Sequence, residues 1–121
     1  MSRNILDESH IHPAIQKKIS ESRVEIVREV QAAIAANAVV VVGMALNPFP
    51  RKARKALDTA GVPYTYLEYG SYLSEWRRRT ALKMWSGWPT LPMVFVKGVL
   101  VGGATELQQL IDSGEFKRML Q

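Results

Sequence analysis

A short loop is the place in this sequence where chemistry could be expected. It reads Asn47-Pro48-Phe49-Pro50 and stands between a β-branched run and a basic stretch. Asparagine is among the best helix N-caps, and proline is favoured in the first helical turn. Because Pro48 and Pro50 carry no N–H, two of the donors that a first turn normally offers are missing. The loop is interpreted as a capped helix start that holds an anion poorly, and a binding role beside it stays open.

Other residues that could carry chemistry are sparse. The chain contains no cysteine, which excludes disulfides, thiolate metal ligands and cysteine nucleophiles. His10 and His12 form a pair with no third ligand close in sequence, so a surface pair is expected rather than a metal site. There is no Ser-His-Asp arrangement and no glycine loop for phosphate. We expect no catalytic residue and no bound metal.

Positive charge is the main electrostatic feature, since 16 Lys and Arg against 11 Asp and Glu give a net charge of +5. This balance favours anionic partners in general. The basic residues gather in two clusters that are expected to share one rim: Arg51, Lys52, Arg54 and Lys55, then Arg77, Arg78, Arg79 and Lys83. A run of like charges is usually a solvated helix face. Trp76, Trp85 and Trp88 could line such a rim, but no nucleic-acid motif is present, so nucleic acid is not expected as a partner.

Length and composition indicate one soluble domain. The 121 residues are 47% hydrophobic and 22% charged. No apolar run reaches the ~18–20 residues that span a bilayer, so no membrane association is expected. Residues 1–7 lack the charged and then apolar stretches of a signal peptide, so a cytoplasmic location is expected.

The first part of the chain has a helical pattern. We divide the chain into an N-terminal extension, residues 1–21, partly helical, and a folded domain over residues 22–121. Ser22-Arg23-Val24-Glu25 fits a capping box and predicts a helix to about residue 37. Isoleucine and valine recur at helical spacing from Ile11 to Ile34. This stripe is expected to be buried, either against the protein's own sheet or in a dimer interface.

The remaining residues alternate between strands and helices. The expected elements are a buried strand at 39–42, helices at 51–60, 74–85 and 104–112, a strand at 62–68, hairpin strands at 93–96 and 99–101, and a short helical tail. Pro63 near the start of its strand indicates either an edge position or a strand entry. Lys97-Gly98 is expected to form the hairpin turn, and Ser74 to cap its helix. The order β-α-β-α-β-β-α predicts an α/β fold, a mixed four-stranded sheet with helices on both faces.

Three stretches of this sequence resemble the glutaredoxins. Trp88-Pro89-Thr90-Leu91-Pro92 resembles the W-P-T-x-P signature of single-thiol glutaredoxins, in which the second proline is cis. The hairpin that ends in Gly102-Gly103 resembles the family's hairpin and double glycine. Asn47 to Pro50 stand where the family carries C-P-Y-C or C-G-F-S. The resemblance covers roughly residues 25–120 and implies a thioredoxin-like glutaredoxin fold, here with an extra N-terminal helical segment.

The resemblance also implies which activity is missing. The family's reaction needs a cysteine thiolate, which helix N–H groups and nearby basic residues stabilise. Asn47 occupies that cysteine's position, so the chain is expected to be redox-inactive. The glutathione-ligated iron–sulfur cluster of single-thiol members also needs the thiolate, so no cofactor is required.

A groove for glutathione is the second implication of the resemblance. Its residues in this chain would be Asn47, Phe49, Arg79, Leu91, Pro92, Gly103, Ala104 and Thr105. Leu91 would pair through its backbone with the cysteinyl part of glutathione. The N–H groups of Gly103 and Ala104 would bind the γ-glutamyl carboxylate, and Arg79 would bind the glycyl carboxylate.

Three functions remain open at this point. The first is a binding or interaction module with glutathione or an acidic protein as partner. The second is a transferase that activates the thiol of glutathione itself, with Asn47 or Tyr72 as the donor to the thiolate. The third is a variant of a thiol–disulfide oxidoreductase whose cysteine was replaced at position 47 or 50.

Overall fold

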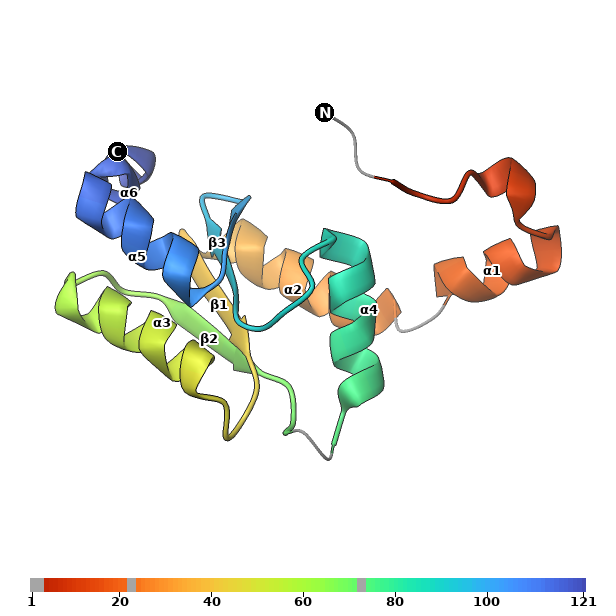
Figure 1. Cartoon of the computed structure of the whole chain (residues 1–121), viewed down its shortest axis with the longest axis horizontal. Helices are drawn as coiled ribbons and strands as arrows, with labels where there is room; N and C mark the ends of the chain where they lie inside the picture. Colours follow the sequence, from red (N-terminus) through yellow and green to blue (C-terminus); the bar gives the residue numbers. More distant parts are fainter. Residues whose placement is uncertain (1–3, 22–23, 72–73) are drawn as a thin grey trace.

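The structure is a computed structural model that describes residues 4–21, 24–71 and 74–121. The elements along the chain are η1 (Glu8–His10), α1 (Pro13–Glu21), α2 (Val24–Ala36), β1 (Val39–Gly43), α3 (Pro48–Thr59), β2 (Thr65–Glu68), α4 (Trp76–Ser86), β3 (Met93–Val96), β4 (Val99–Gly102), α5 (Ala104–Ser113) and α6 (Glu115–Leu120), as Figure 1 shows.

The four strands form one mixed sheet in the order β2-β1-β3-β4. β1 runs parallel to β2, while β3 is antiparallel to both β1 and β4. A parallel pair needs a crossover connection, and α3 supplies it between β1 and β2. The predicted mixed sheet, its parallel pair and the edge position of the second strand are all confirmed.

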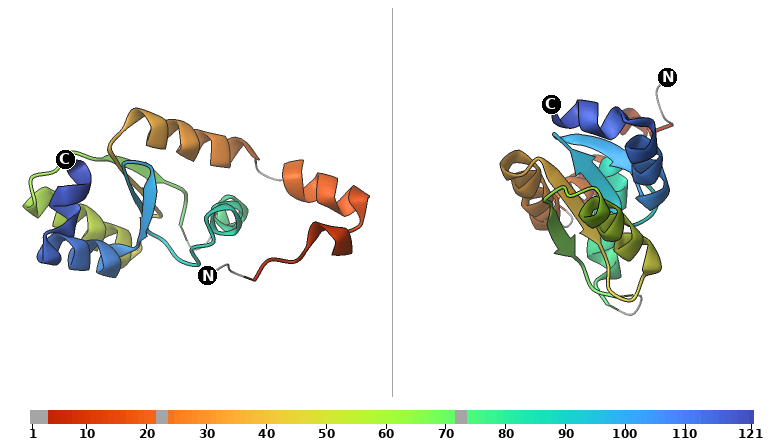
Figure 2. Two further views of the ribbon diagram at one scale, coloured as in Figure 1. Left: turned by 90° about the horizontal axis from the view of Figure 1, so that it is seen from above. Right: turned by 90° about the vertical axis from the view of Figure 1, so that its left-hand side faces the viewer.

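Helices cover both faces of the sheet, and the valines of β1 divide between them. Val40 and Val42 belong to the core under α2 and α4, whereas Val39 and Val41 belong to the core under α3, α5 and α6. Successive side chains of a strand point to opposite faces, so an unbroken valine run serves two cores at once. Figure 2 shows α2 on one side of the sheet, with α3 and α5 on the other.

The helix after β1 begins earlier than expected, at Pro48 rather than at residue 51. Asn47 is its N-cap, with extended backbone angles, and Pro48 is the first helical residue. The two prolines of the loop fit the first turn because that turn needs no intrahelical N–H donor. The loop is therefore part of the helix, as the capped-helix interpretation predicted.

The prediction that Ser74 caps α4 is wrong. The cap position is held by Glu75, whose backbone is left-handed at φ 55° and whose side chain makes no capping hydrogen bond. The Ser74 hydroxyl instead accepts a hydrogen bond of 3.0 Å from the N–H of Ser71, within the turn before the helix. Short hydroxyl side chains bond local backbone in turns as readily as at helix ends.

The hairpin and the last helices follow the expected pattern. Lys97 and Gly98 both have positive φ, 52° and 81°, as a tight two-residue hairpin turn requires. Gly114, at φ 82°, ends α5 and α6 follows at once. The peptide bond between Leu91 and Pro92 is cis.

The apolar stripe of the first part divides between two helices. Ile26 and Val30 of α2 are fully buried against the sheet, so this part of the stripe covers the protein's own core. Ile15 and Ile19 of α1 are about half exposed, at 46% and 48%. α1 lies away from the sheet in both views (Figures 1 and 2). The predicted capping box rests on residues 22 and 23, which lie outside the described residues. No helix in the described ranges is long and apolar enough to cross a bilayer.

Candidate functional site

The first turn of α3 has no free N–H group. Asn47 Oδ1 accepts a hydrogen bond of 2.9 Å from the backbone N–H of Phe49. Pro48 and Pro50, on either side of Phe49, have no N–H to give. A helix N-terminus binds anions through these donors, so this one has lost the main part of that capacity. It retains only the general field of the helix dipole.

Pro50 is a packing residue beneath the loop. It is buried, and a Cβ on Gly43 would lie 2.8 Å from both the Pro50 Cβ and the Tyr66 hydroxyl. Glycine is therefore required at position 43 for β1 to pass under the loop. Pro50 stands where the family carries its second cysteine or serine, and here it packs the helix against the sheet.

Tyr66 and Arg54 complete this packed layer. The Arg54 guanidinium carbon lies 4.1 Å from the centre of the Tyr66 ring, which is a cation–π geometry. The Tyr66 hydroxyl donates a 3.0 Å hydrogen bond to Glu68. Burial, and then the bond to Glu68, raise the pKa of Tyr66 to about 12. Arg54 is therefore turned over Tyr66 and is not available to a basic rim.

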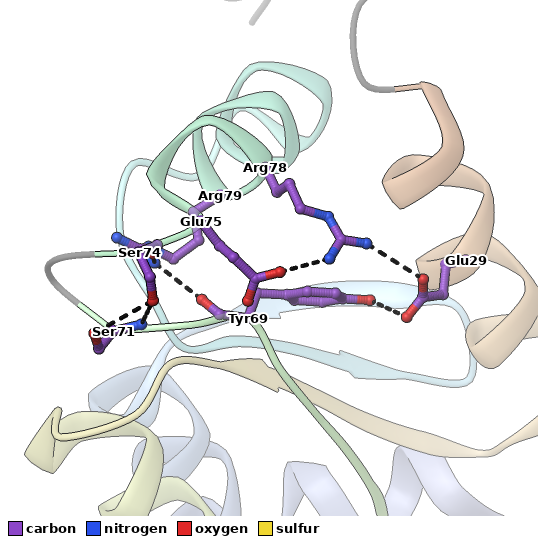
Figure 3. Close-up of polar contacts among 7 residues, drawn as sticks. All are labelled: Glu29, Tyr69, Ser71, Ser74, Glu75, Arg78 and Arg79. Carbon is purple, nitrogen blue, oxygen red and sulfur yellow. Dashed lines mark hydrogen bonds and ion pairs between the residues drawn. The ribbon is translucent and has the colours of Figure 1, made fainter.

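Arg79 points into the protein, which corrects the expectation of a solvated helix face. Only 6% of Arg79 is exposed, and its Nη1 donates to the carbonyl oxygens of Tyr69 at 2.9 Å and Ser74 at 2.5 Å. Figure 3 shows the guanidinium between these two carbonyls. Arg79 thus clamps the connection between β2 and α4. It does not line the groove described below.

Arg78 joins a second set of polar contacts, also drawn in Figure 3. It pairs with Glu75 at 2.6 Å and with Glu29 at 3.7 Å, and Glu29 accepts a 2.8 Å hydrogen bond from the hydroxyl of Tyr69. Burial and the bond to Glu29 raise the pKa of Tyr69 above its ordinary value. Tyr69 and Arg78 thereby tie α2 to α4. Two of the three arginines in the run serve structure rather than a ligand.

The two basic clusters do not form one rim. The basic residues of α3 and the basic residues of α4 lie on opposite faces of the sheet, because the two helices cover different faces. Trp76 is 57% exposed, while Trp85 and Trp88 are half-buried and pack against the core under α2 and α4. The expected combination of a continuous basic edge with three exposed tryptophans is therefore absent from the described residues.

The cis-proline loop and the start of α5 lie against each other. A Cβ on Gly103 would lie 3.4 Å from the carbonyl oxygen of Pro92 and 3.7 Å from Nε1 of Trp88. Leu91 and Pro92 are buried at this junction. The structure thus brings together the two segments that carry the glutaredoxin resemblance, through backbone contacts.

One of the N–H groups expected to bind a carboxylate is already used. Glu106 Oε1 accepts a 2.9 Å hydrogen bond from the N–H of Gly103. The next two N–H groups, of Ala104 and Thr105, are first-turn donors of α5 and have no intrahelical acceptor. The anion-binding capacity that α3 has lost is therefore retained at α5, one residue later than the sequence suggested.

A groove of about 750 Å³ runs between α3 and α5, which lie side by side on one face of the sheet (Figure 1). Its lining comprises Phe49, Lys52, Lys55, Ala56, Thr59 and Ala60 on one side, and Ala104, Thr105, Gln108, Gln109, Ile111 and Asp112 on the other. Of the eight residues that the resemblance marked, the groove gathers Phe49, Ala104 and Thr105 at one end. The lysines were predicted only as part of a basic cluster, and the glutamines were missed. The sequence pattern that could have identified these lysines and glutamines is the polar face of each of the two helices.

Comparison with known proteins gives concordant results. The sequence matches the glutaredoxin family over residues 39–101. A glutaredoxin-like protein of Dictyostelium discoideum is 44% identical over 100 residues, which cover 83% of this chain and 81% of that protein. An uncharacterized monothiol glutaredoxin ycf64-like of Synechocystis is 33% identical over 93 residues, covering 73% and 84%.

Solved structures agree on the fold. Oxidized glutaredoxin 2 from Chlamydomonas reinhardtii has a TM-score of 0.71 at 29% identity, over 83% of this chain and 94% of that one. The buckwheat glutaredoxin–glutathione complex has a TM-score of 0.73 at 24% identity, over 83% and 91%. At 24% identity, the likeness to the buckwheat structure concerns the fold alone.

Proposed function

Because the chain belongs to the glutaredoxin family, we propose that it is a binding protein for glutathione that carries out no thiol–disulfide exchange. One observation carries the second half of this proposal. The residue at the nucleophile's position is Asn47, and its side-chain oxygen accepts the only N–H of the first turn of α3. A carboxamide cannot attack a disulfide, and the turn around it has no donor left to stabilise a thiolate.

The first half rests on what remains at α5 and at the cis-proline loop. Ala104 and Thr105 line the end of the groove, and their N–H groups belong to the first turn of α5, where a γ-glutamyl carboxylate would add the negative charge that a helix N-terminus favours. Among the described residues, Leu91 takes part in no backbone hydrogen bond of a loop or turn. Its N–H and carbonyl oxygen therefore remain for pairing with an extended ligand. Lys52, at the same end of the groove, supplies the cation that Arg79 does not.

A calorimetric or NMR titration with reduced glutathione tests the binding. The sharpest variant is Ala104→Pro, which removes one N–H donor at the first position of α5, where proline is favoured. The preceding residue, Gly103, has an extended backbone with φ −106°, which suits the position before a proline. Ala104→Gly is the matched control, because it keeps the N–H and also alters the side chain.

We expect saturable binding that Ala104→Pro weakens and Ala104→Gly leaves within about twofold. A chain that shows no saturation at millimolar glutathione, or equal binding by the two variants, would contradict the proposed site. The exchange half is tested separately, by reduction of a glutathione mixed disulfide, which the natural chain should not catalyse.

The transferase alternative is tested by one further assay, the turnover of an electrophile with glutathione. It requires a donor to the glutathione thiolate, and Asn47 retains only its amide Nδ2 for this, since Oδ1 is used. The other suggested donor, Tyr72, lies outside the described residues. Turnover of an electrophile with glutathione, lost in Asn47→Ala, would replace the binding proposal with the transferase.

A further inference from the structure

The groove between α3 and α5 extends well beyond the end that glutathione would occupy. Its lining continues from Phe49 to Ala60 along α3 and from Ala104 to Asp112 along α5, so at 1.5 Å per helical residue it is roughly 12–16 Å long. Its volume of about 750 Å³ lies within the range of ligand sites. The far part of the groove has no role in the proposed function.

The two sides of the groove differ in charge. α3 contributes Lys52 and Lys55, both exposed, and neither takes part in an ion pair among the described residues. The one acidic residue of α3, Asp58, does not line the groove. α5 contributes the neutral amides of Gln108 and Gln109. A groove with two uncompensated cations on one side fits an anionic ligand.

The surface between the two sides is apolar and made of small side chains. Ala56, Ala60, Ala104 and Ile111 line it, which lets a bound chain approach closely. Asp112 stands at the far end and accepts a 2.9 Å hydrogen bond from Gln108. A phosphate backbone, whose charges are continuous, would place charge against this carboxylate and the apolar lining, whereas a peptide can place an uncharged residue at both. The lining therefore suits a peptide that alternates apolar and acidic side chains.

We propose that this groove binds a short acidic segment of a partner protein. Lys52 and Lys55 meet two carboxylates on one face of the extended peptide, and the apolar side chain between them, on the opposite face, packs against Ile111 of α5. Residues three apart on a helix lie ~5–6 Å apart at their Cβ atoms, and alternate residues of an extended peptide lie ~7 Å apart, so the two spacings match. The amide of Gln109 can both donate to and accept from the peptide backbone, and Gln108, whose Nε2 donates to Asp112, offers its carbonyl oxygen as an acceptor.

The test uses a fluorescein-labelled peptide in which glutamates alternate with leucines, and a matched peptide with glutamines in place of the glutamates. Fluorescence anisotropy with the full chain measures affinity, and NMR chemical-shift changes locate the site. The variant is Lys52→Glu/Lys55→Glu. The control is Lys117→Glu, an exposed residue of α6 that does not line the groove. A single-stranded oligonucleotide of the same net charge serves as the competing polyanion.

We expect saturable binding of the acidic peptide that weakens with salt, with shifts confined to α3 and α5. The double variant should weaken it by at least about tenfold, and Lys117→Glu by less than about twofold. Equal binding of the glutamine peptide, equal or tighter binding of the oligonucleotide, shifts elsewhere, or absence of saturation would each overturn the proposal. Since the glutathione site is tested through Ala104→Pro, which changes no charge, the two proposals can fail independently.

Discussion

Nη1 of Arg79 lies 2.9 Å from the carbonyl oxygen of Tyr69 and donates to it from a nearly fully buried position. A second carbonyl, of Ser74, accepts from the same nitrogen. The arginine that the family resemblance marked as a ligand for glutathione therefore holds the segment between β2 and α4. That segment also contacts the residues just before the Asn47–Pro50 loop, because the carbonyl oxygen of Gly70 accepts a hydrogen bond of 2.6 Å from the N–H of Ala45.

Arg79→Ala should lower the free energy of unfolding by about 2–4 kcal/mol, because it removes the donor of the buried hydrogen bond to Tyr69 and of the partly buried one to Ser74. Arg77→Ala is the matched control in the same arginine run. Arg77 is exposed and contacts only the ring of Trp76 among the contacts described, so its loss should change stability by less than about 0.5 kcal/mol. Urea unfolding measures both. Equal effects of the two substitutions would mean that the clamp contributes nothing.

The first turn of α3 predicts an ordinary thiol at position 47. In Asn47→Cys, the thiol pKa should stay near its ordinary value of about 8.5, since two N–H donors are missing. Adding Pro48→Gly and Pro50→Ser restores both donors and should lower that pKa. The rate of alkylation against pH reports it directly, because the natural chain has no other cysteine. A pKa that does not move when the prolines are replaced would show that backbone donors are not what the loop lacks.

If the proposed site is correct, Glu106 competes with glutathione for the start of α5. Glu106→Gln keeps an acceptor for the N–H of Gly103 but removes the negative charge beside the groove end. A carboxylate ligand should then bind about two- to fivefold more tightly, in line with ~0.5–1 kcal/mol for a charge at a helix terminus. Calorimetric titration with glutathione measures this, with Gln108→Ala as a neutral control. Weaker binding in Glu106→Gln would place the carboxylate elsewhere.

Tyr66 should titrate late and couple folding to alkaline pH. Its pKa is raised to about 12 by burial and by its bond to Glu68, against about 10 in an unfolded chain. The folded state thus holds this proton more tightly, so the stabilisation is complete below about pH 10 and is lost as the pH rises toward 12. Absorbance titration should show one tyrosinate fewer near pH 12 in Tyr66→Phe, while Tyr69, whose pKa is also raised, keeps its own late phase. An unchanged amplitude near pH 12 in Tyr66→Phe would show that Tyr66 does not titrate there.

The strands and turns of this fold could be read from the sequence because their causes are local. The valines of β1 specify a strand buried on both faces, and Lys97-Gly98 permits the positive φ values of a tight hairpin. Asn47 followed by prolines specifies a capped helix, although its start fell three residues earlier than expected. The sequence contains no cysteine, which by itself establishes that the chain has no thiol.

The directions of the polar side chains were decided only by the tertiary structure. Three successive arginines point to three different directions around a helix, and no local pattern says which one meets the core; here it is Arg79. Tyr69 and Glu29 are 40 residues apart in sequence, and Arg54 meets Tyr66 only because α3 packs over β2. The groove between α3 and α5 likewise arises from two helices that are separate in sequence. Such contacts depend on the path of the whole chain, which local propensities do not contain.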